Sequence, residues 1–353
     1  MDYRHDVGYR RWIYGSLMRA VIKATEYHLP EATLSSEQLA REFPGWPVRK
    51  IEDKTGIRSR HISGEGECSS DLGIAAARKL FASGAVTADE IDYLLFCTQS
   101  PDYFLPTTAC LVQDALGIPI HAGGLDFNLG CSGFIYGLSL AKGLIESGQA
   151  SKLLLITAET YSKFINARDK SVRTLFGDGA AATLIVAEPG VEEAIGPFVF
   201  GTDGRGARNL IVPGGGMRCR VTSGEAKEDS DGNWRSDRDL YMNGAELFNF
   251  TMHQVPDTIQ RLLRKSGSSL GDYDLFVFHQ ANQYMLSHLR KVLRVPEEQF
   301  CIAMADCGNT VSSTIPIALK HTLQEGRLKA GSRVMLVGFG VGYSWGAVSV
   351  KWV

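Results

Sequence analysis

Short, continuously apolar segments alternate with helical segments along most of the chain, and this alternation constrains the fold more than any other feature. The apolar segments 93–97, 153–156, 181–186, 275–278 and 334–337 are rich in branched side chains, as expected of strands buried on both faces. The spacing of apolar residues predicts helices over 71–83, 133–146 and 245–265. This order predicts an α/β fold in which helices cover the sheets.

The two halves of the chain resemble each other in outline. Each combines strands and helices with a glycine-rich turn, at 128–133 in the first half and at 338–343 in the second. Residues 188–190, Glu-Pro-Gly, form a break between them. We therefore predict an N-terminal extension over 1–19, a first half over 20–190 and a second half over 191–353. The polar segment 221–237 is predicted to be an exposed loop or flap.

The composition argues against several classes of function. The formal net charge of −2 lacks the surplus of Lys and Arg that nucleic-acid binders carry. No apolar run reaches the roughly 20 residues needed to cross a bilayer, and the N-terminal residues lack the apolar core of a signal peptide. The seven cysteines form no CxxC pair, which suits free thiols in a reducing compartment. We therefore expect a cytoplasmic protein with neither nucleic-acid nor membrane partners.

Cys131 lies where a predicted strand end, 123–128, meets the predicted helix that begins at Gly133. Backbone N–H groups and the helix dipole at such a junction favour a thiolate and lower its pKa. Gly130 and Gly133 permit a tight turn and the close approach of a substrate. These features make Cys131 a candidate nucleophile, although a small buried thiol without a catalytic role fits the same spacing.

Three further motifs lie in the second half of the chain. His279 directly follows the apolar run 275–278, at a strand end where α/β folds place functional residues. Asn309 precedes a predicted helix over 315–323. The glycine-rich segment 338–346 lacks the Lys-Ser/Thr ending of a phosphate-binding loop, and favours a turn that directs a backbone N–H towards an oxyanion. The structural alternatives are a buried or surface histidine and an asparagine that only caps a helix.

Six motifs in this order resemble those of β-ketoacyl-acyl-carrier-protein synthase III and its relatives in the thiolase superfamily. The likeness begins near residue 20 and covers nearly all of the remaining chain. The motifs lie at 54–62, 128–133, 176–180, 279–282, 308–310 and 343–346. The resemblance implies a thiolase-like five-layered αβαβα fold built from two similar halves, and normally a homodimer.

The resemblance also implies a decarboxylative Claisen condensation. Cys131 would carry the acyl group taken from an acyl-CoA, while His279 and Asn309 would bind the carbonyl of a malonyl thioester on CoA or on an acyl-carrier protein. Backbone N–H groups of Cys131 and Val341 would form the oxyanion hole. CoA thioesters would be substrates, without a tightly bound cofactor or a metal. The implied CoA-binding residues are Lys50, Lys54, Lys170, Gly244, Phe248 and Asn282, and the implied acyl-pocket residues are Leu105 and Tyr343.

The departures from the family pattern concern substrate contacts. Lysines match the Trp and Arg that hold the adenine ring of CoA in the family, and Trp46 is the nearby ring that could replace them. Tyr284 stands in place of an Arg linked to carrier-protein docking. Leu105 stands where the family often has an aromatic residue that crosses the dimer interface, so we expect room for a longer or bulkier acyl group. These changes indicate a specialised relative of the initiating enzyme.

Other functions fit the same residues less well. An acyltransferase that moves the acyl group to oxygen or nitrogen would need Cys131 and His279 but has less need of Asn309. A catalytically silent scaffold subunit would normally lack the nucleophile. Thiolases use a second cysteine near the C-terminus, and the segment 338–346 contains none. Type III polyketide synthases share the Cys-His-Asn trio but match the segments 176–180 and 308–313 less closely.

Overall fold

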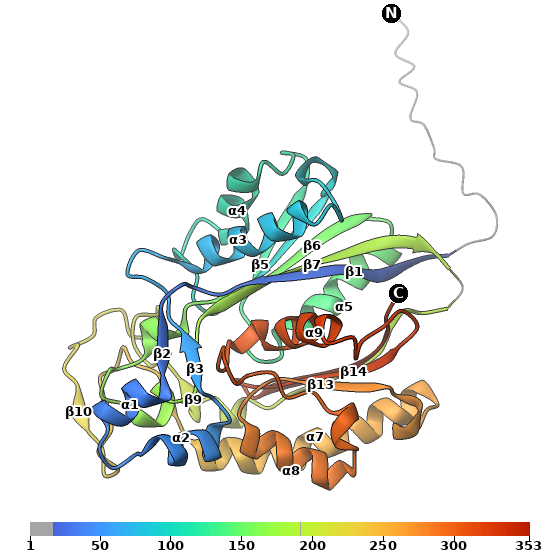
Figure 1. Cartoon of the computed structure of the whole chain (residues 1–353). Helices are drawn as coiled ribbons and strands as arrows, with labels where there is room; N and C mark the ends of the chain where they lie inside the picture. Colours follow the sequence, from blue (N-terminus) through green and yellow to red (C-terminus); the bar gives the residue numbers. More distant parts are fainter. Residues whose placement is uncertain (1–16, 191) are drawn as a thin grey trace, which may run out of the picture.

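Two stacked β-sheets form the centre of the computed structural model, which describes residues 17–190 and 192–353 (Figure 1). The first sheet has the strand order β1 (Met18–His28), β7 (Gly179–Pro189), β6 (Lys152–Glu159), β4 (Tyr93–Cys97) and β5 (Gly123–Phe127). β4 runs parallel to β5 and β6, whereas β7 runs antiparallel to β6 and β1. The apolar runs predicted at 93–97, 153–156 and 181–186 all lie in these strands.

The second sheet repeats part of this arrangement. Its strands follow the order β13 (Leu275–Phe278), β14 (Arg333–Gly340), β15 (Ser344–Lys351) and β8 (Ile195–Thr202). β13 and β14 are parallel, and β15 is antiparallel to β14 and β8. The series β4, β6, β7, β1 has the same succession of parallel and antiparallel pairs. The division of the chain at residue 190 remains a prediction.

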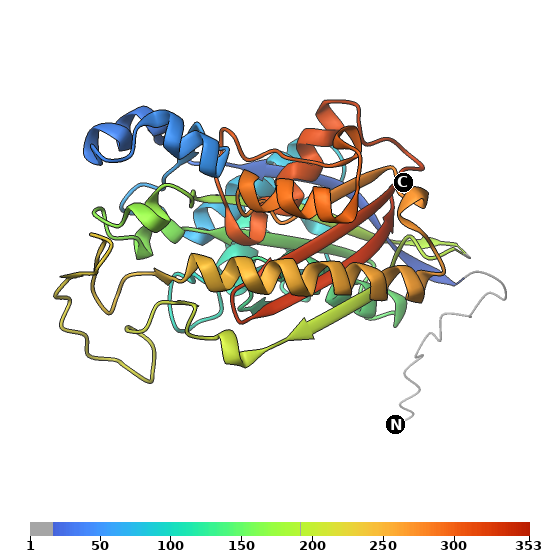
Figure 2. The same cartoon turned by 90° about the horizontal axis from the view of Figure 1, so that it is seen from below.

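Helices cover the outer face of each sheet and fill the space between the sheets (Figures 1 and 2). α3 (Ser69–Ala82) and α4 (Thr108–Leu116) pack on the first sheet, and α7 (Gly244–Ser266) packs on the second with α8 (Gln283–Leu293) beside it. α5 (Gly133–Glu146) and α9 (Thr314–Gln324) contact both sheets. This is the five-layered αβαβα thiolase-like fold that the resemblance implied.

The middle layer holds the two sheets in a fixed relation. One apolar cluster joins α5 and α9 to strands of both sheets, and its members include Ile135, Leu138, Leu155, Ile315, Leu319 and Leu336. Each of these side chains is at most 1% exposed, and full burial of one such side chain contributes about 1.5–3 kcal/mol. Residues that follow strands in different sheets therefore keep stable positions relative to one another.

Short elements gather at one end of the layers. They are β2 (Thr33–Ser35), β3 (Ser59–His61), α1 (Ser36–Glu42), α2 (Val48–Thr55), α6 (Lys170–Arg173), β9 (Leu210–Ile211) and β12 (Tyr241–Met242). The segment 221–237 is a largely exposed loop, as predicted, and contains the small hairpin of β10 (Lys227–Glu228) and β11 (Trp234–Arg235). Most of the predicted extension 1–19 lies outside the described residues, and β1 begins at Met18.

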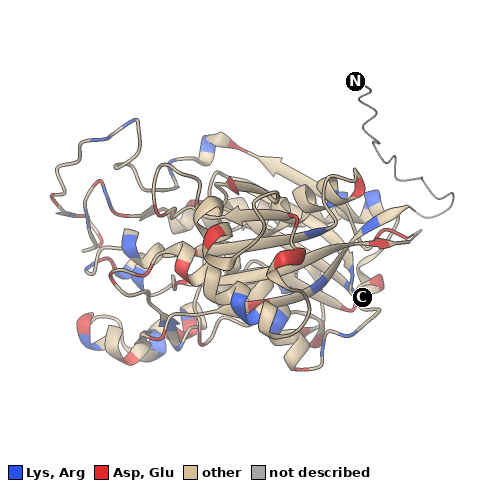
Figure 3. Cartoon of the chain, turned by 90° about the horizontal axis from the view of Figure 1, so that it is seen from above, with Lys and Arg blue, Asp and Glu red and all other residues tan. Residues whose placement is uncertain are grey.

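Charged residues of both signs are interspersed over the outer helices and loops (Figure 3). None of the helices in the described ranges is both long enough and apolar enough to span a bilayer.

Candidate active site

Cys131 lies in the turn between β5 and α5, on the middle layer of the molecule. Its residue is only 6% exposed. The end of β14 passes close to the sulfur, because a β-carbon added at Gly340 would lie 2.7 Å from Cys131 Sγ. Glycine at this position therefore lets a strand of the second sheet approach the cysteine of the first half.

The surroundings of Cys131 raise the pKa of its thiol to about 12. Burial is the main cause, since it penalises the charged thiolate, and the Glu159 carboxyl adds to the effect. Hydrogen bonds from the backbone of Val341 and of Cys131 lower the pKa but do not offset burial. The prediction that the helix end would lower this pKa is therefore wrong for the free chain, because desolvation outweighs the backbone dipoles.

His279 directly follows β13 and is 2% exposed. Its Nδ1 lies 2.8 Å from the Thr314 hydroxyl oxygen at the start of α9. Burial lowers the pKa of His279 to about 3, although the backbone of Val311 favours the charged form. The imidazole is therefore neutral at ordinary pH and can act as a hydrogen-bond donor or acceptor without carrying charge.

Asn309 is 4% exposed and lies in the turn that precedes α9. Its side-chain Oδ1 accepts a hydrogen bond of 2.9 Å from the Val311 N–H, and its Nδ2 donates a longer one of 3.4 Å to the Ala281 carbonyl. Its backbone N–H donates to the Leu175 carbonyl at 2.9 Å. The turn is thereby joined both to the segment after His279 and to Leu175, the residue before the motif at 176–180.

A single cavity of about 80 Å³ is lined by Cys131, His279 and Asn309. We call it the inner cavity. Its remaining lining is mostly apolar and consists of Leu175, Phe176, Leu210, Met242, Gly244, Leu247, Thr251, Ala281, Asn282, Met285, Phe339 and Gly340. The three polar groups therefore meet in a small, largely apolar space, where hydrogen bonds and charges act more strongly than in water.

A larger pocket of about 890 Å³ adjoins the inner cavity. We call it the outer pocket. The two spaces share the lining residues Leu175, Met242, Gly244, Asn282 and Met285. Five of the six predicted CoA-binding residues line the outer pocket, namely Lys54, Lys170, Gly244, Phe248 and Asn282. Asn282 also caps α8, since its side chain accepts a hydrogen bond of 2.8 Å from the Met285 N–H.

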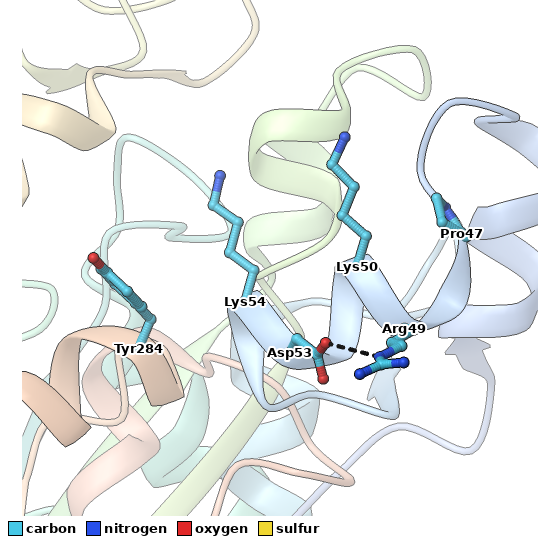
Figure 4. Close-up of a pocket in the computed structure, with 6 residues that line it drawn as sticks. All are labelled: Pro47, Arg49, Lys50, Asp53, Lys54 and Tyr284. Carbon is cyan, nitrogen blue, oxygen red and sulfur yellow. Dashed lines mark hydrogen bonds and ion pairs between the residues drawn. The ribbon is translucent and has the colours of Figure 1, made fainter.

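Lys50, the sixth, lies outside this pocket in a shallow depression of about 630 Å³ beside it. Figure 4 shows Lys50 and Lys54 extending side by side from α2, with Tyr284 of α8 across from Lys54. Both ammonium groups lie over the ring of Trp46, at 4.9 and 5.2 Å from its centroid. An aromatic ring and two cations thus lie together at the rim. The contact of Trp46 with the adenine of CoA stays a prediction.

Neither predicted acyl-pocket residue lines the inner cavity within the described part of the chain. Leu105 is 81% exposed. The Tyr343 ring stacks on Phe250 at 4.0 Å between centroids, and its hydroxyl accepts a hydrogen bond of 2.7 Å from the Asn209 side chain. The acyl-pocket role of both residues stays a prediction.

Sequence reasoning missed most of the lining of the inner cavity. On α7, the lining residues Gly244, Leu247 and Thr251 lie on one helical face, beside Phe248 in the outer pocket. Their spacing of three to four residues was visible in the sequence, but nothing in it indicated that this face meets Cys131. The buried acid Glu159 was also missed, because it ends an ordinary apolar strand.

Comparisons with known proteins indicate the same family that the sequence motifs resemble. Residues 125–204 match the family model described as 3-oxoacyl-[acyl-carrier-protein] synthase III, and residues 263–352 match the model of its C-terminal part. The chain is 38% identical to a β-ketoacyl-[acyl-carrier-protein] synthase III from Streptomyces coelicolor, over 86% of this chain and 88% of the relative. It is 37% identical to a synthase of the same name from Clostridioides difficile, over 95% and 98% of the two chains.

A solved structure supports the same assignment. A crystal structure of a 3-oxoacyl-(acyl-carrier-protein) synthase III aligns with a TM-score of 0.94 and 55% identity, over 95% of this chain and all of that chain. The likeness spans both sheets and all five layers. The protein therefore belongs to the 3-oxoacyl-[acyl-carrier-protein] synthase III family.

Proposed function

We propose that this enzyme condenses an acyl group held on Cys131 with a malonyl thioester, releasing CO₂ and a 3-oxoacyl product. The observation that carries the proposal is the inner cavity, in which Cys131, His279 and Asn309 line one small space. The adjoining outer pocket, with its lysines and aromatic rings, suits the phosphates and the adenine of an acyl-CoA.

The first half-reaction transfers the acyl group. The Cys131 sulfur forms a bond to the thioester carbonyl carbon, the bond from that carbon to the CoA sulfur breaks, and the thiol proton leaves with CoA. Because burial holds the pKa of Cys131 near 12, proton loss accompanies attack instead of preceding it. The backbone N–H groups of Cys131 and Val341 stabilise the oxyanion of the tetrahedral intermediate.

The second half-reaction forms the carbon–carbon bond. The malonyl thioester loses CO₂, and the electron pair of the broken bond becomes an enolate. As charge develops on its oxygen, Asn309 donates a hydrogen bond through Nδ2 and neutral His279 donates one through Nε2. For this tautomer Nδ1 of His279 accepts from the Thr314 hydroxyl, 2.8 Å away. The enolate carbon attacks the acyl carbonyl, the bond to Cys131 breaks, and the thiolate takes a proton from solvent. Loss of CO₂ drives the step, so no strong base is required.

A second copy of the chain completes the acyl pocket in this proposal. Leu105 projects from the molecule in a segment that also exposes Tyr103 and Phe104. The edge strand β5 presents Leu125 beside unpaired backbone groups. Pairing two such edges would cover the apolar side chains and bring Leu105 to the partner's site, as the family resemblance implies.

The condensation is tested by mixing the enzyme with an acyl-CoA and malonyl-CoA and measuring both 3-oxoacyl product and CO₂. We expect the two to form in equal amounts. Asn309→Ala should still acquire the acyl group but should lose decarboxylation. Normal condensation by this variant, or acyl transfer to an alcohol or amine without CO₂ release, would contradict the proposal and favour a simple acyltransferase.

A further inference from the structure

A buried carboxyl group lies between the turns that carry the candidate catalytic residues. Glu159 ends β6 and is fully buried. Its two oxygens accept hydrogen bonds from the Gln99 N–H at 3.0 Å, the Ser100 hydroxyl at 3.2 Å and the Ser312 hydroxyl at 2.8 Å. None of the ion pairs within the described residues includes Glu159. A buried acid without a cation is costly unless it has a specific use.

One of these bonds reaches the turn after Asn309, which has a strained backbone. Val311 has a φ of +55°, a conformation that branched side chains rarely adopt. Such a conformation persists only where the surroundings enforce it. Two serines anchor the turn to β6: Ser312 donates to Glu159, and Ser313 donates to the Thr157 carbonyl at 2.9 Å.

The same strained turn orients both hydrogen-bond donors of the site. The Val311 N–H fixes the Asn309 carboxamide through its bond to Oδ1. The Thr314 hydroxyl oxygen lies 3.1 Å from the Val311 carbonyl oxygen and 2.8 Å from Nδ1 of His279, so it links this turn to the imidazole. A shift of this turn would therefore move Asn309 and His279 together.

The other side of Glu159 faces the nucleophile. Gln99, whose backbone N–H binds Glu159, places its side-chain oxygen against Gly130, since a β-carbon there would lie 2.4 Å from Oε1. Gly130 immediately precedes Cys131. The carboxyl group thus connects the Asn309 turn with the segment beside Cys131, although the two belong to different halves of the chain.

We propose that Glu159 is a positioning residue that holds the Asn309 turn against the Cys131 turn in its neutral, protonated form. This inference rests on the condensation proposed above. The carboxylic acid keeps the acceptors that Ser312 and Gln99 require, without placing a charge beside the sulfur.

The titration of the group is consistent with this role. Burial raises the pKa of Glu159 to about 8, although its hydrogen bonds lower it. The titratable groups that face it are Cys97 on β4, Cys131 before α5 and Tyr161 after β6, and burial raises the pKa of each. Ionisation above about pH 8 would place a negative charge among neutral acids and oppose both thiolate and enolate formation.

The test compares Glu159→Ala and Glu159→Gln with the wild type in the two half-reactions. Acyl loading is followed by intact mass with the acyl-CoA that loads fastest on the wild type, and decarboxylation is followed with malonyl-CoA alone. Asp92→Ala is the matched control, because Asp92 accepts two backbone hydrogen bonds, from Ser151 at 2.7 Å and Lys152 at 3.0 Å, at the opposite end of β6.

We expect Glu159→Ala to decarboxylate at least about tenfold more slowly, with loading within about threefold of wild type. Glu159→Gln should match the wild type at pH 7 and keep its activity above pH 8, where the wild type declines. This pH difference remains measurable if the alanine variant does not fold. Wild-type decarboxylation by Glu159→Ala, an equal loss in Asp92→Ala, or a parallel alkaline decline in Glu159→Gln would overturn this inference alone. A wild type that never loads would overturn both proposals.

Discussion

The inner cavity and the outer pocket share five lining residues, but only the outer pocket is lined by charged side chains. In the inner cavity, burial raises the pKa of Cys131 to about 12 and lowers that of His279 to about 3. The outer pocket is roughly ten times larger by volume and has Lys54 and Lys170 at its walls. Charge is thus suppressed where we propose that bonds change, and it is retained where we propose that the substrate first binds. Substitutions in the two regions should therefore change different kinetic parameters.

His279→Ala, in the inner cavity, is the substitution from which we expect the largest effect. Removing one donor to a developing oxyanion typically lowers kcat by about 10²–10³, so malonyl-CoA decarboxylation should fall by that factor with little change in KM. His288→Ala is the control, because His288 belongs to the aromatic group with Phe248 and Tyr284 beside the outer pocket. A change confined to KM in His279→Ala would contradict the division between chemistry and binding.

The rate at which Cys131 is alkylated tests directly whether burial suppresses its thiolate form. The folded pKa of about 12 lies above the ordinary value of 9.0. The thiolate fraction therefore grows about tenfold for each pH unit up to about pH 8, and less steeply above it, where Glu159 ionises. The iodoacetamide rate at Cys131, read by peptide mass, should keep rising between pH 7 and pH 9. A plateau near pH 7 would show that the helix end dominates after all.

A smaller effect is expected in the outer pocket. Lys54→Ala should raise the KM for acyl-CoA by about threefold and leave kcat unchanged, because an exposed cation contributes little in water. The effect should shrink in high salt and vanish with an acyl-pantetheine substrate that lacks the phosphates of CoA. Lys23→Ala, on β1 and paired with Glu188, is the matched control. A change in kcat instead would place Lys54 in the chemical step.

The smallest effect is expected at Leu105, whose side chain lines neither the inner cavity nor the outer pocket of its own chain. If a partner copy brings it to the acyl pocket, Leu105→Phe should shift the preferred acyl-CoA towards shorter chains by a few-fold and leave malonyl-CoA decarboxylation unchanged. Phe104→Leu, a swap at the neighbouring exposed residue, should not change chain-length preference. Unchanged selectivity in Leu105→Phe would contradict the proposed crossing of the interface.

The sequence predicts the helices and strands better than it predicts which of their side chains come together in the folded chain. The strands 93–97 and 275–278 and the helix 133–146 coincide with β4, β13 and α5, because each is a continuous apolar or periodic segment with clear ends. The strand-to-helix turn that carries Cys131 was also recognisable, yet the direction of the pKa shift of its thiol was not. Burial of that sulfur depends on Gly340 and on side chains more than 40 residues away, which local spacing does not reveal.

The limits of prediction from the sequence are clearest for Glu159 and Tyr343. Glu159 ends an apolar strand, and only the folded chain shows that Ser312 donates a hydrogen bond to it. Tyr343 belongs to a recognisable motif, but stacking on Phe250 decides its orientation. Family resemblance predicted the nucleophile and its partners, whereas the contacts that set the protonation and orientation of these side chains come from tertiary packing.

The central claim is that Cys131 carries the acyl group, and intact-mass measurement after mixing with a panel of acyl-CoAs tests it most directly. We expect one acyl group per chain, mapped by peptide mass to Cys131, and no mass gain in Cys131→Ala. Equal loading of Cys131→Ala, or an acyl group mapped to another of the seven cysteines, would contradict the account.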